Sequence, residues 1–148
     1  MKEFEIVTKK WVRLVSVAAL TGYLAYLFYL TFFSSYFGRD FTRREIKFLP
    51  FVTIIHFFTS SDVNSFIVNI FGNIAAFVPM GFLLPIVVSR VNNLKRVALA
   101  AFFASLFIEI TQYIGWVGTS DVDDLILNVL GGVLGYGIYR MIRRIVIR

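Results

Sequence analysis

Six polar side chains of a kind that binds cations, moves protons or recognises headgroups interrupt an apolar stretch near the end of the chain. They are Glu109, Gln112, Asp121, Asp123, Asp124 and Asn128. Such oxygens ligate hard cations such as Ca²⁺ or Mg²⁺. Paired carboxylates perform acid–base chemistry when their environments differ, and acids that pair with arginines can form a headgroup site. A structural role in helix capping and hydrogen bonding also fits these residues.

The spacing of charges along the chain predicts how deep these acids lie. Arg96 and Glu109 are separated by twelve uncharged residues, about 18 Å of helix. Asp124 and Arg140 are separated by fifteen, about 22 Å. Because a hydrocarbon core is roughly 30 Å thick, Glu109 and Asp124 should lie at or just below one membrane surface. Ionisable groups at that depth usually face the bundle interior and serve function.

Helical spacing predicts that the polar side chains converge. Glu109 and Gln112 are three residues apart and share one helix face. Asn69 and Asn73 are four apart on an earlier apolar segment and also share a face. We expect these two faces to meet the acids that follow, in a carboxylate–amide cluster between three helix ends.

The remaining acids introduce the last apolar segment. Ser120 or Asp121 can cap a helix, and acids in a first turn are favoured by the helix dipole. Asp121, Asp124 and Asn128 follow one another at steps of three and four and so share a face, whereas Asp123 lies off it.

Four apolar segments are long enough to span a membrane. The predicted spans are Trp11–Phe33, Ser65–Val88, Leu94–Ile114 and a last helix that ends near Ile142. Residues 48–61 are apolar but too short to span and are broken by Pro50, so they predict an interfacial or re-entrant segment. The predicted fold class is therefore an all-α membrane protein with four transmembrane helices and one outer interfacial or re-entrant segment.

The composition supports one membrane domain over residues 1–148, because 58% of the 148 residues are hydrophobic and the mean hydropathy is +0.77. The absence of cysteine excludes disulfides, thiolate metal sites and a cysteine nucleophile. The net charge of +6 does not indicate a nucleic-acid partner, since the basic residues flank the apolar spans and form no separate patch. The expected partner is the lipid bilayer.

The distribution of charge predicts the orientation. Eleven of the fifteen Lys and Arg residues lie in the N-terminal segment, the loop around residues 90–96 and the C-terminal tail. Seven of the nine acids lie on the opposite side. By the positive-inside rule both termini are cytoplasmic, and the polar cluster opens outward.

Four pieces of the chain resemble the VanZ-like family. They are Arg44-Glu-Ile-Lys47-Phe-Leu-Pro50-Phe51, the Asn69–Gly81 segment with Gly72, Asn73, Phe77 and Pro79, Glu109-Ile-Thr-Gln112, and the Asp121–Gly131 segment with Asp123, Asp124 and Asn128. The resemblance covers about residues 44–136. Two positions depart from the family pattern: Lys47 stands where members often have Asn, and Gly118 where many have Arg.

The resemblance implies a cell-envelope protein of the bacterial plasma membrane, because the family is named for a protein linked to resistance against teicoplanin, a lipoglycopeptide that binds peptidoglycan precursors. The leading hypothesis is binding of a lipid-linked cell-wall precursor, a lipid headgroup or the lipoglycopeptide. The candidate ligand-binding residues are Arg44, Asn69, Asn73, Glu109, Gln112, Asp121, Asp123, Asp124 and Asn128. A divalent cation is compatible with these residues but is not required by them.

Two other functions remain open. One is a membrane-embedded, metal-assisted hydrolase or transferase, although the sequence offers no obvious nucleophile and no His-based metal motif. The other is a structural partner of a second membrane protein. We also expect Arg44 to pair with Glu109, Asp121, Asp123 or Asp124, because an acid at membrane depth needs a partner.

The orientation can be tested with single cysteines in this cysteine-free chain. Cysteine at Ser35, Ser60 or Ser120 should react with an impermeant maleimide in intact cells, because all three positions are predicted to be external. Labelling of Ser120→Cys only after the membrane is opened would contradict the assignment.

Overall fold

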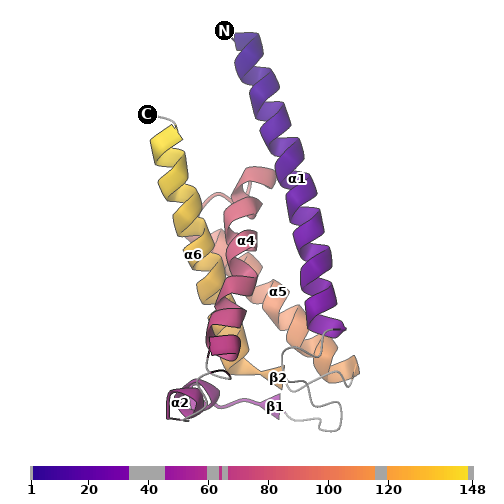
Figure 1. The fold of residues 1–148 in the computed structure, drawn as a ribbon, viewed down its shortest axis with the longest axis vertical. Coiled ribbons are helices and arrows are strands. Elements are labelled where there is room, and N and C mark those ends of the chain that lie inside the picture. Colours follow the sequence, from indigo (N-terminus) through magenta and orange to yellow (C-terminus); the bar gives the residue numbers. More distant parts are fainter. Residues whose placement is uncertain (1, 34–45, 60–63, 65–66, 116–119, 147–148) are drawn as a thin grey trace.

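A computed structural model of the chain describes residues 2–33, 46–59, 64, 67–115 and 120–146. Four long helical segments dominate the fold (Figure 1). They are α1 (Lys2–Phe32), the π-helical turn η1 (Ile67–Phe71) continued by α4 (Gly72–Val87), α5 (Leu94–Gly115) and α6 (Val122–Val146). The shorter elements are β1 (Ile46–Lys47), α2 (Val52–Thr59) and β2 (Ser120–Asp121).

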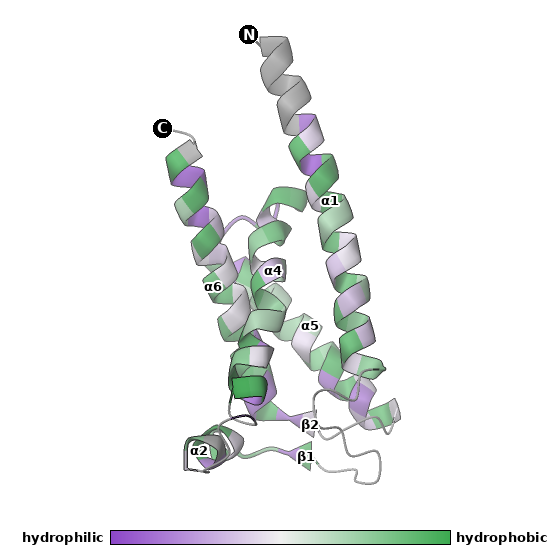
Figure 2. Cartoon of the chain, in the orientation of Figure 1, coloured by the Kyte–Doolittle hydropathy of each residue, from purple (hydrophilic) through white to green (hydrophobic). Residues whose placement is uncertain are grey.

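The predicted fold class is confirmed, because four segments are long and apolar enough to cross a membrane. They run over Lys10–Phe32, Ile67–Val87, Leu94–Gly115 and Val122–Ile145. Hydrophobic positions cover the middle of these helices and hydrophilic ones gather toward their ends (Figure 2). The chain is thus a multi-pass membrane protein.

Two details differ from the prediction. Helix α1 begins well before Trp11, at Lys2. The second span opens with a π turn, η1, which the sequence did not predict. Pro79 and Pro85 lie inside α4, within the predicted span, and membrane helices tolerate proline when neighbouring groups satisfy the freed backbone groups.

The centre of the fold is a close contact between α4 and α6. A Cβ atom added to Gly131 would meet the backbone oxygen of Ile74, and one added to Gly135 would meet that of Val78. From the other helix, a Cβ on Gly81 would meet the backbone of Gly132. Small residues let helix backbones approach closely in lipid, so these glycines allow the backbones of α4 and α6 to touch.

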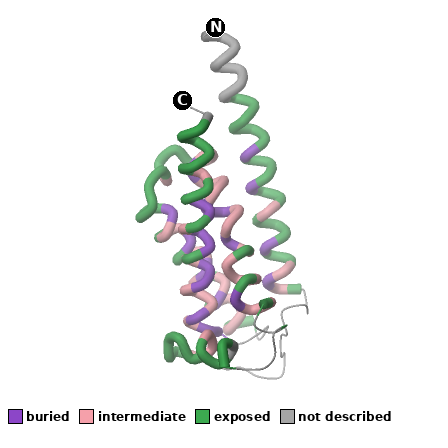
Figure 3. The backbone as a smooth tube through the Cα atoms, turned by 60° about the vertical axis from the view of Figure 1, so that its left-hand side comes forward, coloured by how far each residue is buried: buried purple, intermediate pink, exposed green. Residues whose placement is uncertain are grey.

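Helix α1 lies at the side of this core and contributes a single buried stripe. Ser16, Leu20, Leu27 and Thr31 are buried at helical spacing, and Tyr23 donates a hydrogen bond to the backbone oxygen of Ala76 (2.6 Å). Most other positions of α1 from Lys10 onward are exposed, while the buried positions concentrate on the inner helices (Figure 3). The exposed apolar face is what a helix in contact with lipid should present.

The two ends of the bundle differ. Both chain termini lie at one end, and α2, β1 and β2 lie at the other (Figure 1). Helix α2 lies across this second end of the bundle in both views (Figures 1 and 3). Of the two alternatives for residues 48–61, the structure therefore favours an interfacial helix over a re-entrant one for α2.

The close contact at the glycines predicts that the free energy of unfolding depends strongly on side-chain volume at these positions. Gly135→Ala should lower the free energy of unfolding by about 1–3 kcal/mol, because the added methyl meets the α4 backbone, which cannot move aside like a side chain. The measurement is unfolding of the purified protein in detergent.

Gly137→Ala is the matched control, since a Cβ there meets nothing within 4 Å. It should be neutral or stabilise the helix by about 0.5–1 kcal/mol. Equal effects at the two positions would show that helix propensity, and not close packing, decides the result.

Candidate functional site

The acidic segment begins with a helix cap. The Asp121 carboxylate accepts a hydrogen bond from the backbone N–H of Asp123 (Oδ1, 2.9 Å). Because α6 starts at Val122, this is the geometry of an N-cap side chain that binds the second helical N–H. Asp123 and Asp124 occupy the first turn, where the helix dipole favours anions. The predicted cap at Asp121 is confirmed.

Asp123 binds the start of a different helix. Its carboxylate accepts hydrogen bonds from the backbone N–H groups of Phe51 (Oδ1) and Ile54 (Oδ2, 3.0 Å), at the N-terminus of α2. Phe51 has a positive φ of 68°, a strained conformation for a residue with a side chain. The side chain of Asp123 is completely buried (0% exposed). It thus serves as an N-terminal cap supplied from α6 to α2.

Asp121 binds the same segment through side chains. Its Oδ2 accepts a hydrogen bond from Thr53 Oγ1 (2.6 Å) and lies 3.7 Å from Lys47 Nζ. The parallel pairing of β1 with β2 places Lys47 directly opposite Asp121. Neither Thr53 nor the strand pair was predicted from the sequence. Lys47, which departs from the family pattern, places its ammonium group beside the carboxylate of Asp121.

Glu109 and Asp124 lie behind this outer layer. Glu109 is buried and its Oε2 accepts a hydrogen bond from the backbone N–H of Asp121 (3.0 Å). The hydroxyl of Ser120 donates to the backbone oxygen of Glu109 (2.8 Å). Asp124 Oδ1 accepts from the side-chain amide of Asn73 (2.6 Å). The predicted meeting of helix ends is observed: α4, α5 and α6 each contribute one of these side chains.

One helical turn deeper, a second polar pair joins α5 to α6. Asn128 Nδ2 donates to Ser105 Oγ (2.9 Å), and both side chains are buried. Ser105 was not among the predicted site residues. It lies four residues before Glu109, so the helical spacing that grouped the other residues would have placed it on the same face.

Three predicted site residues are not shown in the cluster. Gln112 donates from Nε2 to the backbone oxygen of Thr31 (3.2 Å), so it joins α5 to the end of α1. Asn69 lies in η1 and has polar interactions of its own. Arg44 lies outside the described residues, and its pairing stays a prediction.

The buried position of Ser120 also corrects the labelling experiment. A cysteine at Ser120 would be shielded from maleimide, because only 9% of this residue is exposed. Ser89 is exposed between α4 and α5, at the predicted cytoplasmic end. A cysteine at Ser89 is therefore the internal control for Ser35 and Ser60.

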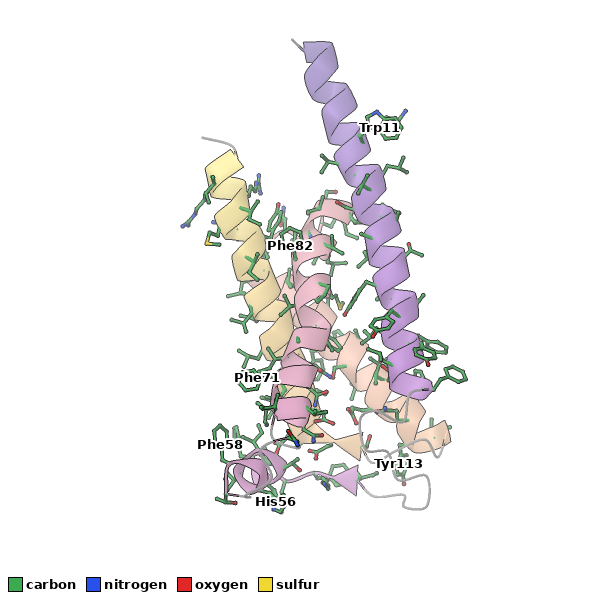
Figure 4. The ribbon with its side chains drawn as sticks, viewed as in Figure 1. Trp11, His56, Phe58, Phe71, Phe82 and Tyr113 are labelled. Atoms are coloured by element: carbon green, nitrogen blue, oxygen red, sulfur yellow. The ribbon has the colours of Figure 1, made fainter. Side chains whose placement is uncertain are left out.

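The acids of the outer layer, Asp121 and Asp123, bind groups of the protein itself. Within the described residues, no group of three or more His, Cys, Asp or Glu side chains is arranged to hold a metal ion. His56 lies on α2, at the end of the molecule beyond the bundle (Figure 4). Asp121 and Asp123 instead bind backbone and side-chain groups of the α2 segment. Glu109, Asp124, Asn73 and Asn128 form the inner part of the site.

Together, these features define a four-span membrane protein whose acidic end holds an interfacial helix. The VanZ/LLP1 family model matches residues 20–143, so the chain belongs to the VanZ/LLP1 family. The chain is similar to Protein VanZ of Enterococcus faecium, with 28% identity over 131 residues that cover 86% of this chain and 74% of that protein. No solved structure matches the chain. The resemblance inferred from residues 44–136 is confirmed and extends into α1.

The Asp123 contact predicts how α2 is held. Asp123→Asn should loosen α2, because an amide presents an N–H₂ group to one of the two backbone N–H groups that the carboxylate accepts. A lost charged hydrogen bond of this kind costs about 1.5–3 kcal/mol. Hydrogen exchange at Phe51 and Ile54 should accelerate.

Thr53→Ala is the matched control, since it removes a contact with Asp121 but leaves the Asp123 cap in place. Its effect on exchange at Ile54 should be smaller. Unchanged exchange in Asp123→Asn would show that α2 is held by other contacts.

Proposed function

We propose that this VanZ-family protein binds an envelope amphiphile at the acidic end of the bundle. The ligand is a lipid-linked cell-wall precursor, a lipid headgroup or a lipoglycopeptide, and binding contributes to teicoplanin resistance. The observation that carries the proposal is a buried to half-buried carboxylate–amide cluster directly next to an apolar helix that lies across the end of the bundle.

The polar part of the ligand would meet the inner residues. Glu109 and Asp124 offer carboxylate oxygens, which accept hydrogen bonds from hydroxyl, amide or ammonium groups. Such charge-assisted bonds are short and strong. Asn73, which binds Asp124, supplies an amide beside them. A headgroup rich in sugar hydroxyls and amides matches this set of acceptors.

The apolar part of the ligand would meet α2 and the residues before it. Phe48, Leu49, Val52, Ile55 and Phe58 are all more than half exposed. Phe58 lies on α2 at the outer end of the bundle (Figure 4). A short helix with this surface suits the boundary between headgroups and acyl chains. An amphiphile could thus place its chain against α2 and its headgroup at the acids.

The proposal is tested by direct binding to the purified protein. A lipid-linked precursor and teicoplanin are titrated in separate experiments, with mass analysis of the lipid in parallel. Glu109→Gln should weaken binding about tenfold or more, because a charged hydrogen bond contributes about 1.5–3 kcal/mol. Glu5→Gln makes the same chemical change at the far end of α1 and should bind normally.

Two results would overturn the proposal. Equal affinity in Glu109→Gln and wild type would show that the charge of Glu109 plays no part in binding. Conversion of the lipid would assign the site to an enzyme. The hydroxyl of Thr53, which donates to Asp121, is then the first nucleophile to test, and turnover that disappears in Thr53→Ala would identify it.

A further inference from the structure

Four polar side chains form two rungs between α5 and α6, which we call the polar ladder. On α5, Ser105 lies four residues before Glu109, and on α6, Asn128 lies four residues after Asp124. Side chains four apart stack on one helix face. The hydrogen bond between Asn128 and Ser105 (2.9 Å) forms the deeper rung. The upper rung is Glu109 and Asp124, which lie one turn above these residues on the same two helix faces.

The deeper rung contains a polar atom without a protein partner. Asn128 is only 5% exposed, and its Oδ1 has no hydrogen-bond partner among the described residues. Exchanging the oxygen and nitrogen of the Asn128 amide still leaves one buried polar atom unpaired. Ser105 Oγ would then bind the oxygen, and the nitrogen would have no acceptor. Burying an unpaired polar group costs about 1–3 kcal/mol. This oxygen therefore points to a bound group between α5 and α6.

The partners of the two acids are neutral groups. Glu109 accepts from the backbone N–H of Asp121, and Asp124 accepts from the Asn73 amide. Contacts of this kind orient metal-binding carboxylates from outside. Below the ladder the helices close, because a Cβ on Gly132 would lie 2.8 Å from that of Ala101. The polar ladder therefore ends where α5 and α6 pack closely.

We propose that the polar ladder binds a hard metal cation, with Ca²⁺ preferred. Glu109, Asp124, Asn128 Oδ1 and Ser105 Oγ would supply the protein ligands. Two carboxylates and two neutral oxygens suit Ca²⁺, which accepts irregular sets of carboxylate, amide and water oxygens. Mg²⁺ demands near-octahedral geometry and gives up its water reluctantly, and Na⁺ would leave one negative charge uncompensated.

The cation site shares Glu109 and Asp124 with the proposed amphiphile site and adds Ser105 and Asn128, which lie a turn deeper. Its test measures cation-dependent stability without any amphiphile, so the failure of one proposal is distinguishable from the failure of the other. A bound cation would link α5 to α6 and compensate the charges of Glu109 and Asp124. It could therefore be present before any envelope ligand arrives.

The test is cation-dependent stability of the full chain in detergent. Thermal unfolding is followed with Ca²⁺, Na⁺ or Mg²⁺ as chloride salts, against choline chloride at equal ionic strength. A ligand that binds only the folded state raises the midpoint in proportion to its saturation. Wild type should gain several degrees in Ca²⁺, less in Na⁺ and Mg²⁺, and nothing in choline. Isothermal titration should detect Ca²⁺ binding directly.

Asn128→Leu removes the unpaired amide and should abolish the Ca²⁺-dependent gain, while its midpoint in choline stays near that of wild type. Ser105→Ala should reduce the gain, and Asn128→Asp should preserve it. Asn92→Ala, an exposed amide in the loop before α5, is the matched control and should respond like wild type. An absent Ca²⁺ response in wild type, or an equal response in Asn128→Leu, would overturn the proposal. A midpoint that rises in Na⁺ but not in Ca²⁺ would overturn the preference for Ca²⁺ and assign the site to a monovalent cation.

Discussion

The structure depends on how one membrane-end carboxylate is compensated. An ionised side chain at this depth is expensive unless donors surround it. Asp123 is completely buried and receives two backbone N–H groups from the start of α2. These N–H groups have no partner within their own helix. The carboxylate therefore supplies their acceptor, and they supply its donors. The acid is stabilised and an otherwise marginal eight-residue helix is held across the end of the bundle.

This contact requires the helix ends to be brought together accurately. Gly81, Gly131 and Gly135 permit backbone contact between α4 and α6, which places Asn73 within hydrogen-bond distance of Asp124. Membrane helices associate without a hydrophobic driving force between them. Close packing in the middle of the membrane and hydrogen bonds at its surface therefore cooperate to determine the position of the site.

The acids of the site form an outer and an inner layer, which make different contacts. Asp121 and Asp123 bind the α2 segment, through Lys47, Thr53 and backbone N–H groups. The inner carboxylates, Glu109 and Asp124, are held by neutral groups that leave their charge to be compensated by other means. That difference is why the envelope ligand and the cation are both proposed for the inner layer and not for the outer one.

The sequence alone determined the four spans, a helix cap at Ser120 or Asp121 and the family, because span length, capping chemistry and motif spacing are local properties of the chain. It also predicted that Glu109, Asp124 and Asn73 meet, since acids at one depth must share an interior. Only the tertiary structure decided that Asp123 binds α2, that Gln112 reaches α1 and that Ser105 joins Asn128. Those partners lie on separate elements. Periodicity orients a side chain about its own helix but contains no information on the helix that faces it.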